Sequence, residues 1–127
     1  MLNIFINKLV KNNLMRIFFI HWNEEELKEK IRPLKEAGYK VDYHFSTEIT
    51  ANLKDDLPDI LIICLDRLPS HGKAYAEWLW EAKKRQNIPI IFCGGKIEKV
   101  EPIKENFPTA VFCNNDTLLQ TLSKLKK

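Results

Sequence analysis

The sequence predicts one α/β domain in which helices cover both faces of a parallel sheet. Residues 59–65 form an almost unbroken apolar run, which is typical of a strand buried on both faces. From Met15 onward, segments with strand character alternate with segments with helix character, and the connections are short. A chain of 127 residues with 45% hydrophobic and 29% charged residues suits a single globular domain.

Short-range signals predict the first two strands and the helix between them. Residues 16–20 are an apolar run, and residues 39–45 alternate between apolar and polar side chains, as edge strands do. Asn23 has the side chain of a helix N-cap, and three glutamates follow it where the helix dipole favours carboxylates. Apolar residues then recur at helical spacing as far as Gly38, which is expected to end the helix.

The second half of the chain continues the alternation. Residues 47–56 are expected to form a short helix and residues 59–65 the central strand. A helix over 72–87, a strand over 90–93 and a helix over 97–107 follow, with Pro102 expected to kink the last of these or to mark its first turn. Residues 110–113 are expected to form the fifth strand, and Asn115 or Asp116 to cap a final helix that carries Leu118, Leu119, Leu122 and Leu125.

Composition excludes several classes of protein. The net charge of +3 arises largely from lysines at the C-terminal end, so neither nucleic acid nor a membrane is expected as a partner. No apolar run approaches the roughly 18 residues of a membrane span. Three cysteines without CxxC spacing indicate reduced thiols in a cytoplasmic protein. Residues 1–14 are interpreted as an N-terminal extension or a mis-called start ahead of a domain over 15–127.

Several short motifs resemble a known family. They are Pro58-Asp59 before the central strand, Leu68-Pro69 and Gly72 after it, and Ile88-Pro89-Ile90-Ile91 at the fourth strand. In these residues the chain resembles a response-regulator receiver domain, the flavodoxin-like module of two-component signalling. His21-Trp22-Asn23 and the segment from Arg67 to Gly72 also resemble bacterial receiver-like proteins. The resemblance spans residue 15 to the C-terminus and implies three layers with sheet order 2-1-3-4-5.

Receivers accept a phosphoryl group on an aspartate at the end of the third strand. They bind Mg²⁺ with an acidic pair after the first strand, and use a hydroxyl after the fourth strand and a lysine after the fifth. By this resemblance the five positions carry Cys64 (acceptor), His21 and Trp22 (acidic pair), Gly94 (hydroxyl) and Asn114 (lysine). A shifted register would make Asp66 the acceptor without restoring the metal ligands or the lysine. The chain is therefore predicted to be a degenerate, non-phosphorylatable receiver that needs no cofactor and is not an enzyme.

One hypothesis for its function is a protein-interaction module. At about 100° per residue, Tyr75, Trp78, Leu79 and Ala82 share one helix face and are expected to pack on the sheet. Trp80 then points roughly 140° away from Tyr75, as an exposed anchor for a partner would. The alternative is that Trp80 packs beneath a loop or the N-terminal arm. By the resemblance, a homodimer through the fourth and fifth units is a further expectation.

Two other hypotheses concern the carboxyl ends of the strands. Cys64, Cys93 and Cys113 end three neighbouring strands near His21 and His71, which would suit Zn²⁺ or a redox-sensing thiolate. The alternative is that the strand pleat directs the thiols to different sides, where they fill the core.

The third hypothesis is a small-ligand pocket at the same edge. Gly94-Gly95 would admit a ligand near the backbone, Ser70 would hold an anion, and Arg67, Asp66 and the two histidines would supply charge. In the alternative, Ser70 caps a helix, Arg67 pairs with Asp66, His21 is hydrogen bonded at the rim and the glycines form a turn.

Overall fold

The computed structural model describes residues 16–45, 57–66, 69–81 and 86–125, and these residues form a five-stranded parallel sheet flanked by helices. The strand order is β2-β1-β3-β4-β5, as predicted. The strands are β1 (Arg16–Ile20), β2 (Lys40–His44), β3 (Ile60–Cys64), β4 (Ile90–Cys93) and β5 (Val111–Cys113). The helices are α2 (Glu24–Glu36), α3 (Pro69–Glu81), α4 (Ile97–Asn106) and α5 (Leu118–Leu125), with a 3₁₀ turn, η1 (Asn115–Thr117), before α5.

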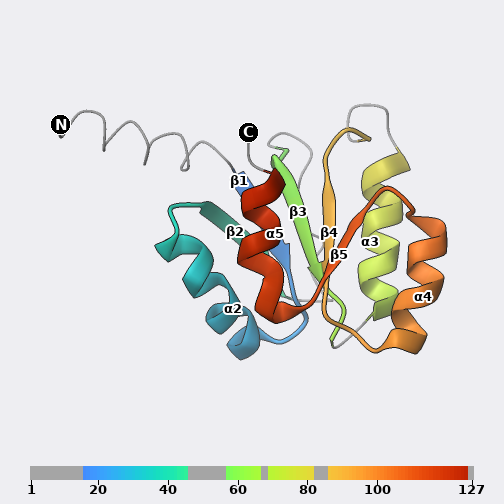
Figure 1. The fold of residues 1–127 in the computed structure, drawn as a ribbon, viewed down its shortest axis with the longest axis horizontal. Coiled ribbons are helices and arrows are strands. Elements are labelled where there is room, and N and C mark those ends of the chain that lie inside the picture. The colour runs from blue at the N-terminus through green and yellow to red at the C-terminus, as the bar shows by residue number, and fades with distance from the viewer. Residues whose placement is uncertain (1–15, 46–56, 67–68, 82–85, 126–127) are drawn as a thin grey trace.

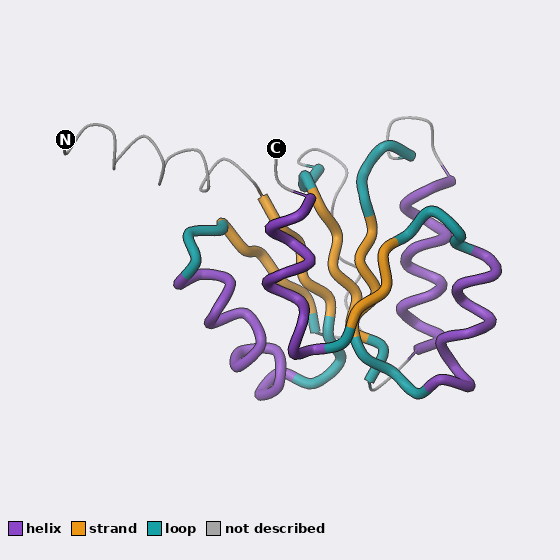
Figure 2. Tube along the Cα trace, in the orientation of Figure 1, coloured by secondary structure: helices purple, strands orange, loops and turns teal. Residues whose placement is uncertain are grey.

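The molecule has three layers, with α2 and α5 on one face of the sheet and α3 and α4 on the other (Figure 1). Each face has its own apolar core, one around Phe19 and Leu27 and the other around Phe92 and Leu79. All five residues of β3 are buried, because this strand is covered on both faces and flanked by β1 and β4. The carboxyl ends of the strands and the loops that follow them lie along the lower edge in Figure 2.

The ends of α2 are formed by the residues that the sequence indicated. The side-chain oxygen of Asn23 accepts a hydrogen bond from the backbone N–H of Glu26 at 3.0 Å. Gly38 follows the helix with a φ of 98°, a left-handed conformation that favours glycine.

The cap of the last helical segment differs from the prediction. Asn114, rather than Asn115 or Asp116, accepts the hydrogen bond from the backbone N–H of Thr117, at 2.9 Å. The Thr117 hydroxyl in turn accepts a hydrogen bond from the backbone N–H of Asn114, which completes a capping box. This cap begins a short 3₁₀ turn ahead of α5 and leaves the Asn115 side chain available for another contact.

The buried face of α3 also differs from the prediction. The helix begins at Pro69, three residues earlier than expected. Over residues 72–81 its buried residues are Gly72, Ala76 and Leu79, while Tyr75 and Trp78 are half-buried and pack against the side of the same core. Small side chains at the first two of these positions let the helix axis approach the sheet closely, so the contact face is rotated from the one that the aromatic residues suggested.

This rotation corrects the interpretation of Trp80 as an exposed anchor. Trp80 lies one turn after Ala76, next to the helix face that packs on the sheet, and is half-buried. Its indole N–H donates to the backbone carbonyl of Ile88 at 2.9 Å, and its ring packs against Phe107 with centroids 5.4 Å apart. Trp80 therefore contributes to the core between α3 and α4 and is not a free partner contact.

Gly72→Ala is expected to lower the free energy of unfolding by about 1–2 kcal/mol. A Cβ atom at this position would lie 2.6 Å from Cγ2 of Ile63 and 3.2 Å from Cδ2 of Leu65, both buried. Urea denaturation measures the loss, and Ala74→Gly on the exposed side of the same helix is the control. A stabilised Gly72→Ala variant would contradict the close packing of α3 on β3.

At the edge of the sheet, β2 exposes 41% of Tyr43 and 37% of the following Phe45, in agreement with an edge strand. The helix proposed for 47–56, the 1–14 segment and Ala82 lie outside the described residues. Within the described ranges, no helix combines the length and apolar character needed to cross a bilayer.

Candidate functional site

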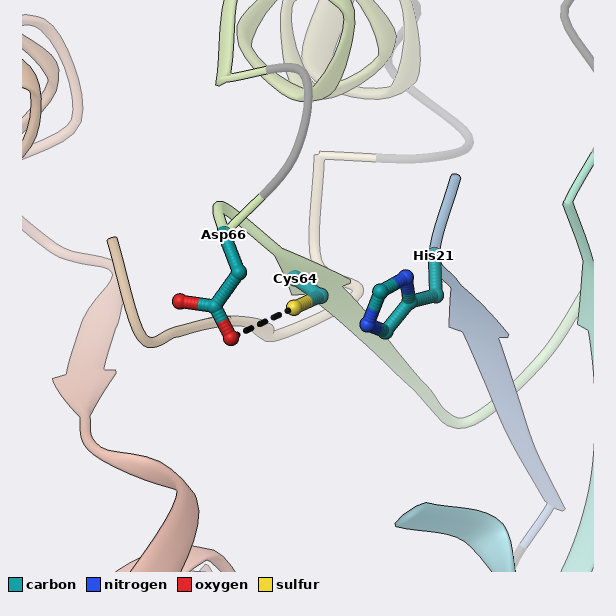
Figure 3. Close-up of side chains that lie close together, drawn as sticks. All are labelled: His21, Cys64 and Asp66. Carbon is teal, nitrogen blue, oxygen red and sulfur yellow. Dashed lines mark hydrogen bonds between the residues drawn. The ribbon is translucent and has the colours of Figure 1, made fainter. Parts of the chain in front are cut away.

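The candidate site lies where β1, β3 and β4 end, and three of its side chains are drawn in Figure 3. His21 directly follows β1 and is 0% exposed. Cys64 is the last residue of β3 and is also 0% exposed. Asp66 follows two residues later, with 32% of its side chain exposed. The imidazole, the thiol and the carboxylate thus converge from two neighbouring strands, with the Asp66 carboxylate nearest to solvent.

A lysine that the sequence did not single out lies at the centre of this group. The ammonium nitrogen of Lys30 is 2.8 Å from Oδ2 of Asp66 and 3.3 Å from Sγ of Cys64. It is also 3.2 Å from Nε2 of His21. Lys30 comes from α2, on the same side of the helix as the buried Leu27 and Leu34. The Lys30 side chain therefore extends from the core face of α2 and places its ammonium at the ends of β1 and β3.

Asp66 is held by three donors besides the Cys64 thiol. Lys30 donates to Oδ2, the backbone N–H of Gly95 donates to Oδ1 at 2.8 Å, and Nδ2 of Asn115 donates to Oδ2 at 3.1 Å. Burial alone would raise the pKa of Asp66, but these hydrogen bonds outweigh burial and hold its pKa well below the ordinary value. Asp66 is therefore ionised and its negative charge is already compensated within the chain.

Lys30 remains charged for the complementary reason. Burial alone would lower its pKa, yet the hydrogen bond to Asp66 and the interaction with Cys64 raise the pKa of Lys30 above its ordinary value. The Lys30–Asp66 pair is only partly accessible, with 20% and 32% of the two side chains exposed. The site thus contains a fixed ion pair at physiological pH.

Cys64 is the residue that the resemblance to receivers places at the position of the phosphoryl acceptor. Burial raises the pKa of the Cys64 thiol to about 11. The hydrogen bond with the Asp66 backbone and the charge of Lys30 lower this pKa, but burial outweighs them. Its proton is directed at Oδ2 of Asp66, 3.4 Å away (Figure 3). Because the thiolate is the nucleophilic form of cysteine, this side chain is chemically inert at neutral pH.

The His21 ring is fixed on both sides. The backbone N–H of Asn23 donates to Nδ1 at 3.1 Å, so the neutral ring has its proton on Nε2. Nε2 lies 3.3 Å from Oε1 of Glu26 and 3.2 Å from Nζ of Lys30. This agrees with the alternative in which His21 is hydrogen bonded at the rim of the sheet.

The residues do not fit the Mg²⁺ ion that the receiver fold implies. One ligand atom from each of His21, Cys64 and Asp66 lies within 4.8 Å of the others, but only Asp66 offers the oxygen that Mg²⁺ prefers. The Lys30 ammonium is within 3.3 Å of an atom of all three. A doubly charged ion would have to share this space with a positive charge, which Coulomb repulsion opposes.

The remaining predicted receiver positions are occupied as follows. Gly94 has a φ of 76°, and a Cβ atom there would overlap the Asp66 carboxylate, so the position leaves no room for a hydroxyl side chain. Asn114 caps η1 and is replaced by its neighbour Asn115 as the residue that reaches Asp66. Trp22 is half-buried and packs edge-on against His44 at 6.2 Å.

The side chains of the predicted ligand contacts Arg67, Ser70 and His71 are not described by the structure. Arg67 lies outside the described residues altogether, whereas Ser70 and His71 belong to the first turn of α3. The two residues that sequence reasoning missed are Lys30 and Asn115. Lys30 had a detectable signal, since a lysine within the apolar stripe of an amphipathic helix requires a charged partner.

The fold belongs to the flavodoxin-like class, with functional side chains at the carboxyl ends of parallel strands. The structure is similar to that of the chemotaxis response regulator CheY4 of Vibrio cholerae, with a TM-score of 0.69. The two sequences are 16% identical, and the match covers 86% of this chain and 96% of CheY4. No family model matches the sequence, and no curated protein matches it.

Proposed function

We propose that this chain is a receiver-like signalling domain that accepts no phosphoryl group, is not an enzyme, and acts through contacts with another protein. The observation that supports the first part is the Lys30–Asp66 ion pair, with nitrogen and oxygen 2.8 Å apart at the ends of β1 and β3. The fold supports the signalling part, since it is the fold of CheY4, a response regulator.

The ion pair disfavours phosphoryl transfer in two ways. Transfer requires a nucleophilic oxygen and cations arranged around the transferred group. Asp66 has both carboxylate oxygens engaged by donors of the chain itself, so an attack would first break hydrogen bonds to Gly95, Asn115 or Lys30. Among the described residues the cation that contacts Asp66 is Lys30, which is already paired, and the residues of the site are poor ligands for Mg²⁺.

A groove next to the site provides a surface for a partner. It lies between α2 and the start of α5 and has a volume of about 430 Å³. Its lining combines apolar and acidic side chains with two residues that hold Asp66; these are Glu29, Lys30, Pro33, Leu34, Asn115, Asp116, Leu118 and Leu119. A protein bound in this groove would therefore contact Lys30 and Asn115 directly, and would be sensitive to the state of the site.

Acetyl phosphate with Mg²⁺ is expected to leave the mass of the intact protein unchanged. Beryllofluoride is likewise expected to cause no shift in the amide resonances of Gly95 or Cys64. A receiver domain with the complete acidic set, treated in parallel, shows that the reagents are active. A stoichiometric phosphoryl adduct on Asp66 would refute the proposal.

A photoreactive amino acid at position 119 is expected to cross-link one partner protein in cells, whereas the same amino acid at position 97 is not. Leu119 is 37% exposed at the groove, and Ile97 is 79% exposed at the start of α4, so both positions are accessible. The cross-link at 119 is expected to be unchanged by acetyl phosphate. Cross-linking at 97 to a second copy of the chain, with none at 119, would favour the α4–β5 homodimer over the groove.

A further inference from the structure

Three cysteines lie in one row on the α2–α5 face of the sheet. In the parallel register Cys64 is level with Cys93, and Cys93 is level with Cys113. All three belong to the core beneath α2 and α5 or pack against it, so the pleat does not separate them. Neighbouring strands are about 4.8 Å apart, within the Cα separation of roughly 4.4–6.8 Å that a disulfide spans.

The two outer cysteines of this row, Cys64 and Cys113, differ in the reactivity expected of them. Cys64 is fully buried on the central strand, and its pKa is raised to about 11. Cys113 is half-buried on β5, an edge strand of three residues that is hydrogen bonded on one side only. The neighbouring Cys93 thiol and the hydroxyls of Thr121 and Thr117 lower the pKa of Cys113 to about 7, despite the opposing effect of burial. Cys113 therefore combines access to solvent with thiolate character, the two conditions for a reactive cysteine.

Cys93 is placed to act as a second, resolving thiol, because it is level with Cys113 on the adjacent strand. It is fully buried, and its contact with Cys113, together with burial, raises its pKa, so it keeps its proton. Its thiol donates to Oδ1 of Asn115 at 3.0 Å. The same Asn115 side chain donates through Nδ2 to Oδ2 of Asp66 at 3.1 Å. One side chain thus connects the thiol pair to the Lys30–Asp66 ion pair.

We propose that Cys93 and Cys113 form a peroxide-reactive thiol pair whose oxidation alters the Asp66 site through Asn115. The Cys113 thiolate attacks one oxygen of a hydroperoxide; the O–O bond breaks, the leaving oxygen takes a proton as alcohol or water, and Cys113 becomes a sulfenic acid. Cys93 then attacks the Cys113 sulfur, the S–O bond breaks, and the hydroxyl leaves as water with the proton from Cys93. Two thiols are oxidised to one disulfide, and one hydroperoxide is reduced.

The disulfide would remove the proton that Cys93 donates to Asn115. The amide of Asn115 would lose one of the contacts that orient its Nδ2 toward Asp66. Oxidation would then act on the same residues that line the groove between α2 and α5. This link to the site rests on the proposed function, whereas the thiol chemistry does not.

The test treats the reduced full-length chain with one equivalent of hydrogen peroxide at pH 7. The intact mass is expected to fall by two hydrogens, and peptide mapping to identify a Cys93–Cys113 disulfide. Cys64→Ser is expected to behave as the wild type, Cys113→Ser to form no disulfide, and Cys93→Ser to stop at a sulfenic acid that dimedone traps. A disulfide through Cys64, disulfides only between molecules, or no disulfide in the wild type would overturn the proposal.

Two measurements on the wild-type chain make the test independent of whether the variants fold. Iodoacetamide is expected to alkylate Cys113 at least about tenfold faster than Cys64, and equal rates would overturn the assignment of the reactive thiol. On oxidation, the side-chain amide of Asn115 and the backbone amide of Gly95 are expected to shift in NMR spectra. If the disulfide forms and neither resonance moves, the coupling to Asp66 is refuted, whatever acetyl phosphate does in the separate experiment.

Discussion

Gly94→Ser, which introduces the hydroxyl side chain that the resemblance to receivers predicts at this position, is expected to lower the free energy of unfolding by about 3 kcal/mol. About 1–2 kcal/mol of this arises because the backbone φ of 76° is a left-handed conformation that non-glycine residues avoid. The remainder arises because the new Cβ would overlap the Asp66 carboxylate and displace it from the N–H of Gly95. Equilibrium denaturation in urea measures the loss.

Two controls separate these contributions. Gly38→Ser tests the backbone cost at the end of α2, where φ is 98°, and is expected to cost about 1–2 kcal/mol. In an Asp66→Ala background, Gly94→Ser is expected to cost no more than Gly38→Ser, since the overlapping carboxylate is gone. Equal costs for the two glycines in the wild-type background would show that Asp66 does not occupy the space beside Gly94.

Lys30→Met is expected to destabilise the protein by about 2 kcal/mol at neutral pH. Breaking a buried ion pair costs about 3–5 kcal/mol, and exposed pairs contribute 0–1 kcal/mol; the partial exposure of this pair places it between these limits. Methionine retains much of the apolar length of the lysine, so the loss reports mainly on the charge. Denaturant unfolding of Lys30→Met, Asp66→Asn and the double variant gives the coupling energy directly.

The effect of Lys30→Met is expected to depend on pH in a defined way. Because the pKa of Asp66 in the folded chain is below its ordinary value of 3.8, its contribution to stability is present above about pH 4 and is lost as the pH falls further. The pKa of Lys30 lies above its ordinary value of 10.5, so its contribution is present below that pH and is lost as the pH rises through the folded pKa. The difference between wild type and variant should therefore be greatest between about pH 5 and pH 10.

Lys28→Met is the matched control for this experiment. Lys28 lies on the same helix and pairs with Glu24 at 3.5 Å, but 63% and 50% of the two side chains are exposed. Its loss is expected to be at most about 0.5 kcal/mol and to be screened by salt. If Lys28→Met and Lys30→Met had equal effects, the Lys30–Asp66 pair would be an ordinary surface contact.

The fold was predictable because each element carries local signals that agree with one another. The apolar run of β3 required burial on both faces, Asn23 and Gly38 marked the ends of α2, and the motifs around Pro58-Asp59 indicated the strand order. The orientation of α3 was less accessible. Its contact face is decided by how closely Gly72 and Ala76 let the helix approach β3, which is a property of the packed pair of elements rather than of the helix alone.

The candidate site was predictable in its location but not in its chemistry. Resemblance placed His21, Cys64 and Gly94 at the ends of the strands, where the structure has them. The resemblance covered only the five positions at which receivers carry functional side chains. Lys30 lies on α2, which contains none of these positions, and was therefore missed. Asn115 was missed because the choice between it and Asn114 depends on which of the two caps η1.

The ammonium of Lys30 has one further consequence. A metal ion in solution occupies its site according to its concentration, and a chelator removes it, whereas a charge attached to the backbone is present at a constant effective concentration in every molecule. The electrostatic state at the ends of β1 and β3 is therefore set when the polypeptide folds. Neither magnesium starvation nor EDTA would change it.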